Sequence, residues 1–319
     1  MAITLFTNSS AMSASNALQK ANSTLSSAME HLGTGKRINK ASDDAAGLQV
    51  ATRLQGQTNG MAVAQRNIAD ASTMLQTGEG AMDEVSNIMY RMKDLATQGA
   101  TDTNTADSRK AIDTEMDSLK TELNSIMGNT SYAGNKLFSD TKDSSGAVTS
   151  KAKMGSAMTF QTGSESGETT KVDVSSQLAS VFSSISSLST ASVQDTAAVA
   201  GTAEVKDANG NVTTPAVAAK DAVSGTANAN ALIDTLNTAL DNVSSLRSSF
   251  GASINGLSHA SANLTNMKDN TDQALGNIQD ADFASEASKM TRSQMLAQTS
   301  TSMLKQSNSM SSLVMSILG

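Results

Sequence analysis

Apolar residues recur at every seventh position along much of this chain, and this repeat constrains its fold more than any other feature. One series consists of Met61, Ile68, Leu75, Met82, Met89 and Ala96, and a second of Leu236, Val243, Phe250, Leu257, Leu264, Thr271 and Ile278. A third series alternates by four and three residues through Ile112, Met116, Leu119, Leu123 and Ile126. This spacing places apolar side chains on one face of an α-helix and predicts left-handed pairing with another helix.

The first series predicts one long helix from about Ser42 to Gln98. Ser42 is the predicted N-cap, and the carboxylates of Asp43 and Asp44 would lie near the positive end of the helix dipole. At a rise of ~1.5 Å per residue, such a helix is on the order of 85 Å long. It is therefore too long to be the core helix of a compact domain. The chain's one proline, Pro215, lies outside all three series, as uninterrupted helices require.

The middle of the chain has a different pattern. The stretch "AMTFQTGSESGETTKVDV", residues 157–174, predicts two strands joined by a turn at "SESG". Residues 191–227 are rich in Ala, Thr and Val with turn signals, and predict a small surface excursion. The predicted fold is therefore mainly α: a long antiparallel coiled-coil rod formed by the N- and C-terminal arms, with a small β-hairpin and an irregular central excursion.

Both ends of the chain are nearly uncharged. Lys20 is the only charged side chain from Met1 to Met29, and Lys305 is the only one from Ser293 to Gly319. Each end carries an apolar stripe at seven-residue spacing: Leu18, Leu25 and Leu32 at one end, and Leu296, Met303, Met310 and Ile317 at the other. The opposite faces hold small polar residues, which suit burial against more protein. Two interpretations stay open: two helices of a bundle core, or an inner layer of an assembly.

Composition and motifs argue against several functions. The net charge is −7 and aromatic residues are 3% of the chain, so we expect no nucleic-acid binding. No run reaches the ~18 apolar residues of a membrane span, so we expect no membrane insertion. The first 19 residues lack a continuous apolar core, so we also expect no signal peptide. The chain has no cysteine, and its two histidines, His31 and His259, stand apart. Since no catalytic, metal or cofactor motif is present, we expect no enzyme, no metal and no cofactor.

Three stretches resemble bacterial flagellin. They are "GKRINKASDDAAGLQVATRL" at 35–54, "QRNIADASTMLQTGEGAMDEVSNIMYRMKDLATQGA" at 65–100, and "IQDADFASEASKMTRSQMLAQTSTSMLKQSN" at 278–308. The resemblance covers roughly 1–140 and 228–319, in the family's order. It implies a structural subunit that polymerises into the bacterial flagellar filament for motility, located outside the cell. The alternatives are a hook–filament junction protein and a secreted coiled-coil adhesin or effector.

The resemblance also implies a domain organisation. Residues 1–40 with 283–319 would be inner-tube terminal helices, 41–190 with 228–282 the helical rod domain with its β-hairpin, and 191–227 the small variable excursion. The charged cluster of Lys36, Arg37, Lys40, Asp43 and Asp44 would then be a spoke that pairs with neighbouring subunits. An ordinary capped helix start with solvated charges is the other interpretation of this cluster. We also expect the ends of the free monomer to be disordered until they assemble.

The implied partners are other copies of the chain, an export chaperone and the flagellar export apparatus, and the filament cap and hook-junction proteins. A host Toll-like receptor is a further implied partner. Its motif, an Arg four residues before a Leu with a Glu on the next helix, is matched by Arg91, Leu95 and Glu115.

Overall fold

The computed structural model describes residues 8–142, 148–189, 191–194, 205–206, 212–214 and 225–318. For 141–142, 148–150, 205–206, 212–214 and 311–318 it describes the backbone alone. The helices in these ranges are α1 (Ser9–Thr34), α2 (Ala45–Gly99), α3 (Ala106–Asn129), α4 (Ser175–Ser189), α5 (Gly225–Gln279) and α6 (Phe283–Leu318), with a 3-10 turn, η1, at Lys153–Gly155. The mainly α fold and the long helix predicted from about 42 to 98 are thus confirmed.

The strands in the described ranges form separate two-stranded antiparallel hairpins. The pairs are β1 (Ser131–Tyr132) with β2 (Asn135–Lys136), β3 (Thr141–Lys142) with β4 (Val148–Ser150), β5 (Met158–Gln161) with β6 (Thr169–Val172), and β7 (Val205–Lys206) with β8 (Val212–Thr214). The hairpin predicted near 157–174 is confirmed as β5–β6, with Met158 opposite Val172 and Gln161 opposite Thr169. Most of the predicted excursion at 191–227 lies outside the described residues.

The chain divides into two compact units. Unit 1 contains Met1–Ala62 and Thr265–Gly319, and unit 2 contains Val63–Leu264. Each unit therefore combines segments from both halves of the sequence.

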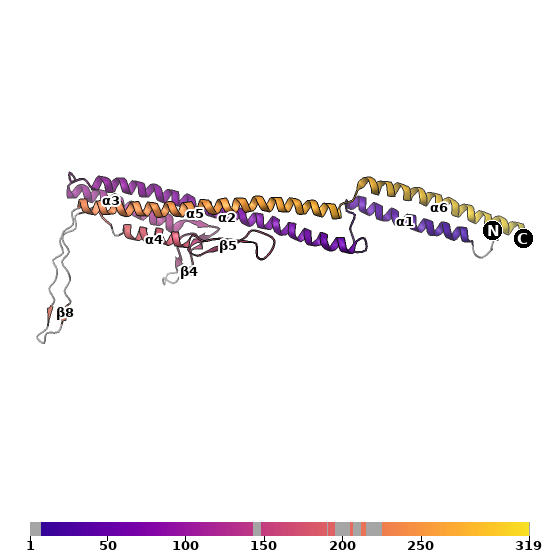
Figure 1. Cartoon of the computed structure of the whole chain (residues 1–319), viewed down its shortest axis with the longest axis horizontal. Helices are drawn as coiled ribbons and strands as arrows, with labels where there is room; N and C mark the ends of the chain where they lie inside the picture. Colours follow the sequence, from indigo (N-terminus) through magenta and orange to yellow (C-terminus); the bar gives the residue numbers. More distant parts are fainter. Residues whose placement is uncertain are drawn as a thin grey trace. The chain divides into compact units, whose positions relative to one another are not determined.

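Unit 2 is built on the predicted seams. The seam residues of α2 from Ile68 to Ala96 and those of α5 from Leu236 to Leu264 are buried, and Phe250 is among the largest fully buried side chains. The Arg247 guanidinium on α5 lies 2.9 Å from the Asp83 carboxylate on α2, and Figure 1 shows the two helices side by side. Burial of large apolar side chains on both helices is what stabilises them, because helices of this length gain little from propensity alone.

The α3 seam is only partly as predicted. Ile112, Met116 and Leu123 are buried, but Leu119 and Ile126 are half-buried, and Met127 takes an inner place instead. The reason is geometric: a 3.6-residue helix drifts away from a strict four–three alternation within a few turns.

Helix α4 was not predicted. Residues 175–189 lie between the predicted hairpin and the predicted excursion and received no helix prediction, yet α4 forms there and packs against α3 and α5, and Figure 1 shows it beside α5. The signal was present in the spacing of its buried residues, Leu178, Val181, Ile185 and Leu188. Their three- and four-residue steps place them on one helix face, and burial of that face overrides the low helix propensity of serine.

Unit 1 contains the pair α1–α6. At the start of α1, the side-chain Nδ2 of Asn8 donates to Ser307 Oγ late in α6 at 2.7 Å. Near the end of α1, His31 lies beside Glu286 at the start of α6. The two helices are therefore antiparallel, and Figure 1 shows them side by side. Asn8 also caps α1, because its side-chain oxygen accepts a hydrogen bond from the Ala11 amide.

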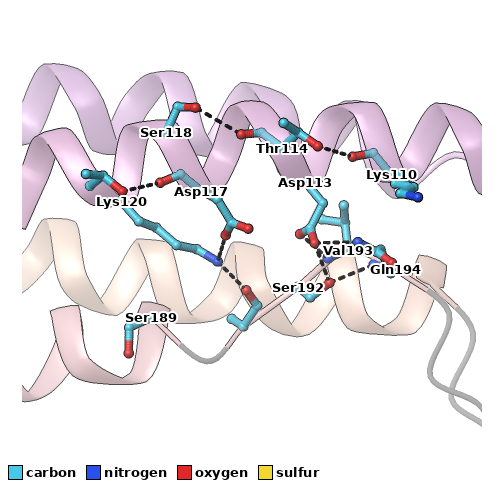
Figure 2. Close-up of polar contacts among 12 residues, drawn as sticks. Lys110, Asp113, Thr114, Asp117, Ser118, Lys120, Ser189, Ser192, Val193 and Gln194 are labelled. Carbon is cyan, nitrogen blue, oxygen red and sulfur yellow. Dashed lines mark hydrogen bonds and ion pairs between the residues drawn. The ribbon is translucent and has the colours of Figure 1, made fainter.

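A buried carboxylate holds the segment that follows α4. Asp113 on α3 is 7% exposed. Its oxygens accept hydrogen bonds from Ser192 Oγ at 3.1 Å, the Val193 amide at 3.3 Å and Gln194 Nε2 at 2.7 Å (Figure 2). A charged acceptor with three donors is among the stronger hydrogen-bonded arrangements in a protein interior.

One turn earlier on α3, the buried Arg109 contacts the start of α5. Its guanidinium donates to Thr226 Oγ1 at 2.9 Å and to the Gly99 carbonyl at 3.3 Å. A Cβ at Gly225 would approach Arg109 Cδ and the Val193 carbonyl to 2.7 Å, so glycine permits this close packing. Asn228 Nδ2 donates to the Gln194 carbonyl at 2.6 Å. Residues 194 and 225, the two ends of the central excursion, are thus held together.

We expect Asp113→Ala to lower the free energy of unfolding of unit 2 by about 2–3 kcal/mol, because it leaves buried donors on 192–194 without their acceptor. Urea denaturation followed by circular dichroism measures this. Asp117→Ala is the matched control: Asp117 lies one turn away, its side chain is 65% exposed and it bonds Lys120 (Figure 2), so the loss should stay below about 0.5 kcal/mol. Equal losses in the two variants would contradict the assignment.

Candidate functional site

The described residues contain no cluster of metal-ligating side chains. Within the ranges that the structure covers, no group of three or more His, Cys, Asp or Glu side chains could hold a metal ion. None of the helices in these ranges is long and apolar enough to cross a membrane. The surfaces that remain to be considered are the loop between α1 and α2, the α1–α6 pair and the Arg91–Glu115 region.

The loop from Gly35 to Asp44 is fixed to the connection between α5 and α6. Gly35 ends α1 in the left-handed conformation, with φ 72°, and its amide donates to the His31 carbonyl. The Arg37 amide then donates to the Gln279 carbonyl at 2.7 Å, and the Ala281 amide donates to the Gly35 carbonyl at 2.9 Å. These two bonds make a short antiparallel bridge.

The charged side chains of this loop mostly have partners within the chain. The Arg37 guanidinium donates to the Ile278 carbonyl at 2.8 Å, where the last turn of α5 carries the negative end of its dipole. Lys40 Nζ lies 2.7 Å from Glu30 Oε2, and this hydrogen-bonded carboxylate raises the pKa of Lys40. The Lys36 side chain forms no ion pair with any described residue.

Asp43 and Asp44 organise the start of α2. Asp43 Oδ2 accepts hydrogen bonds from the amides of Lys40 and Asn39, and these bonds lower the pKa of Asp43. Asp44 is the cap, because its Oδ1 accepts a hydrogen bond from the Gly47 amide at 2.8 Å. The prediction that Ser42 caps the helix was wrong: the bonds to Asp43 hold 39–43 as a turn, so the helix begins at Ala45.

The α1–α6 seam is made of small residues. On α1 the buried side chains are Ala14, Ala21 and Ala28, and on α6 they are Glu286, Ser293 and Ser300, again at seven-residue spacing. Alanine and serine bury little apolar area, so this pairing gains much less free energy than the seams of unit 2. This repeat is present in the sequence, but sequence patterns favour the larger apolar residues at neighbouring positions.

Glu286 is the charged group of the seam. It lies 2.8 Å from Lys289 Nζ and 3.6 Å from His31 Nδ1. The hydrogen bond from Lys289 lowers the pKa of Glu286 below its usual 4.5, and the charge of Lys289 and the nearby His31 act in the same direction. Because this pKa is lower in the folded state, the interaction stabilises the pair above pH 4.5 and is lost as the pH falls through the lowered pKa.

The predicted C-terminal stripe does not face α1. Leu296 is 52% exposed, Met303 61% and Met310 58%. Leu296 and Met303 each lie three residues after a buried seam residue, Ser293 and Ser300, or about 60° around the helix from it, and Met310 continues the same seven-residue spacing. On α1, Leu18, Leu25 and Leu32 are half-buried at the flank of their seam. The side chain of Ile317 lies outside the described residues. A single chain thus leaves a row of large apolar side chains in water, which marks an interaction surface.

Arg91, Leu95 and Glu115 have different environments. Arg91 on α2 and Glu115 on α3 come together, with Nη2 and Oε1 2.7 Å apart, and both side chains are about half exposed. Leu95 is 2% exposed and belongs to the core of unit 2. The ion pair is therefore on the surface, whereas the leucine is buried.

Two family comparisons cover most of the chain. Residues 5–143 match the bacterial flagellin N-terminal helical region, and residues 233–318 match the bacterial flagellin C-terminal helical region. Flagellin A of Vibrio anguillarum is 34% identical over 381 residues, and Polar flagellin A of Vibrio parahaemolyticus is 34% identical over 379. In both comparisons all of each chain is covered.

Among solved structures, a putative flagellar hook-associated protein from Vibrio parahaemolyticus has a similar fold. Its TM-score is 0.50 at 20% sequence identity, and the match covers 75% of this chain and 100% of that one. At this identity, the likeness concerns the fold alone.

We expect Gly47→Ala to disturb the loop at 35–44. The added Cβ would lie 2.5 Å from an Asp44 carboxylate oxygen and 2.7 Å from Ile38 Cδ1, and Ile38 is buried. Overpacking of this kind costs about 1–3 kcal/mol, so hydrogen-exchange protection of residues 36–50 should fall. Gly56→Ala on the same helix has nothing within 4 Å of its Cβ and should raise stability by about 0.5–1 kcal/mol. Unchanged protection in Gly47→Ala would refute this packing.

Proposed function

The chain belongs to the bacterial flagellin family, and from that premise we propose which of its surfaces hold it in the assembled filament. Flagellins are structural proteins rather than enzymes, and this chain is a subunit that polymerises into the bacterial flagellar filament, which serves motility. The observation that carries the proposal is the uncovered apolar stripe of Leu296, Met303 and Met310 on α6.

We propose that this stripe packs against other copies of the chain. A fully buried large apolar side chain contributes about 1.5–3 kcal/mol, and these side chains are more than half exposed in one chain. The α1–α6 seam, made of Ala and Ser, adds little. Polymerisation is therefore the step that supplies the missing burial. It also explains why the nearby faces lack charge, since a buried charge without a partner is costly.

The proposed organisation has an inner tube, a rod and an excursion. Residues 1–40 with 283–319 form the inner tube, with Leu18, Leu25, Leu32 and Ile317 beside the α6 stripe. Residues 41–190 with 228–282 form the rod domain, and 191–227 form a small variable excursion on the filament surface. The heptad burial along α2 and α5 supports the rod, because it makes a stiff element that does not need the inner helices for its core.

We propose that the loop at 35–44 is the spoke between these layers. Its backbone is held by the bonds to Gln279 and Ala281, so Lys36, Arg37 and Lys40 are presented in a fixed arrangement. Lys36, which has no ion pair within the described chain, is the residue best suited to a carboxylate of a neighbouring subunit. Asp43 and Asp44 serve the spoke by fixing its turn and the first turn of α2.

Further partners follow from the same premise. The apolar stripe is exposed before assembly, and we propose that an export chaperone binds it until the subunit enters the flagellar export apparatus. At the growing and basal ends of the filament, the filament cap and hook-junction proteins would meet the same surfaces. The working location is the filament outside the cell.

We also propose that a host Toll-like receptor recognises unit 2 around Arg91 and Glu115. Their ion pair is exposed across α2 and α3, so both side chains could exchange it for contacts with a receptor. Leu95 would act indirectly, because it is buried in the core of unit 2.

Removal of residues 1–30 and 290–319 should abolish polymerisation, because it deletes α1 up to its last turn and the whole stripe. Electron microscopy of seeded or salted-out protein would show long tubes from the full-length chain and none from the truncation. Circular dichroism should still report a helical protein, since the unit 2 core is intact. Tubes from the truncated chain would disprove the role of the terminal helices.

Arg37→Ala should raise the critical concentration for polymerisation about threefold to tenfold. The loop would lose its hydrogen bond to the Ile278 carbonyl of α5, and the spoke would lose a positive charge that can pair with a neighbouring subunit. Sedimentation of polymer at several protein concentrations measures this. Lys171→Ala, which removes an exposed positive charge from the β5–β6 hairpin, is the charge-matched control and should have little effect. An Arg37→Ala protein that polymerises normally would count against the spoke.

Monomeric Arg91→Ala should lose at least about tenfold in potency in a receptor reporter assay, as expected for an exposed arginine at a protein interface. Lys110→Ala, an exposed lysine on α3, is the control for general loss of charge. If Arg91→Ala signals with the potency of the wild type, the receptor proposal fails, and the filament proposal is unaffected.

A further inference from the structure

The sulfur atoms of this chain fall into two environments. The chain has 18 methionines and no cysteine, so thioethers are its only oxidisable sulfur. In unit 2, Met82, Met89 and Met92 have no exposed surface. On α6, Met303 is 61% and Met310 58% exposed, and both belong to the apolar stripe.

We propose that Met303 and Met310 form an oxidation-sensitive modification site that controls polymerisation. In the thioether form the stripe packs on neighbouring subunits, and in the sulfoxide form it does not. This inference rests on the proposed packing of the stripe, and it adds a chemical condition under which that packing fails.

The reaction needs only a peroxide. A lone pair of the methionine sulfur attacks one oxygen of hydrogen peroxide, the O–O bond breaks, and a sulfur–oxygen bond forms. The second oxygen leaves as water after it takes up the proton. The sulfur is oxidised by two electrons and the peroxide is reduced. A thiol-dependent reductase reverses this: the sulfoxide oxygen leaves as water and two thiols become a disulfide.

A sulfoxide within a packed stripe would lack donors. Its oxygen is a strong acceptor, and an acceptor buried without a donor is destabilising. Two of the hydroxyls beside Met303 are engaged: Thr299 Oγ1 donates to the Met295 carbonyl at 2.9 Å, and Ser302 Oγ donates to the Gln298 carbonyl at 3.1 Å. A sulfoxide oxygen would compete with these bonds for a donor, and the apolar side chains of the stripe carry none.

Assembly itself should protect the site. Once the stripe is covered by neighbouring subunits, peroxide cannot reach the two sulfurs. Oxidation would thus act on subunits that have not yet polymerised and spare those within the filament. The buried methionines of unit 2 would be spared in both states.

The first experiment treats full-length monomer and assembled filament with hydrogen peroxide and maps the products by mass spectrometry. We expect a gain of about 16 Da at Met303 and Met310 in the monomer, and none at these positions in the filament or at Met82 and Met89 in either. Oxidised monomer should show a critical concentration at least about tenfold higher, restored by a methionine sulfoxide reductase with dithiothreitol. Normal polymerisation of oxidised monomer would overturn the proposal.

Variants test which methionines are responsible. Met303→Leu with Met310→Leu keeps the stripe apolar and should polymerise normally before and after peroxide. Met267→Leu with Met295→Leu is the matched control, because both residues are exposed and lie outside the stripe. This control should remain as sensitive as the wild type. If the stripe variant stays sensitive, or if the control becomes resistant, the assignment to Met303 and Met310 is overturned.

A third variant separates this inference from the packing on which it rests. Met303→Gln with Met310→Gln is polar but cannot be oxidised, and we expect it not to polymerise. If it polymerises normally, the stripe is not an interface, and both proposals fail. If it fails to polymerise while oxidised wild type succeeds, the packing stands and the oxidation proposal alone is lost.

Discussion

Burial of seven-residue seams is the interaction on which the rest of this structure depends. Helices α2 and α5 each contain 55 residues, and most of the stability of a helix in a protein comes from packing of its apolar face rather than from helix propensity. In unit 2 the cover comes from within the chain, because Phe250, Leu75 and Met82 have no exposed surface. Unit 2 therefore has a complete core, and its surface can carry charged pairs such as Arg91 with Glu115.

The α1–α6 pair follows the same repeat with a different outcome. Its seam uses Ala21 and Ser293 where unit 2 uses large apolar residues, so pairing brings the helices close without much burial. The large side chains lie at the flank, where one chain cannot cover them. This division agrees with the proposed packing of the stripe on other copies of the chain, because a subunit that covered all of its apolar surface alone would gain no further burial on polymerisation.

Much of the fold was predictable because it follows from spacing. The helix from about 42 to 98, the seam on α5 and the hairpin at 157–174 all agree with the structure. The failures have local causes. Helix α4 was not predicted, because the burial that stabilises it depends on partners distant in sequence. Asp44 rather than Ser42 caps α2 because Asp43 uses the preceding amides to hold a turn, a competition that no spacing rule contains.

The sequence by itself determined that the chain is helical, that its ends lack charge and that it resembles flagellin, because periodicity, composition and motif order are properties of the chain alone. Only the tertiary structure decided which face of each terminal helix is used. Leu296, Met303 and Met310 form the more conspicuous repeat, yet Ser293 and Ser300 face α1. Close approach of two helices favours small side chains, and this preference acts only when the partner helix is present.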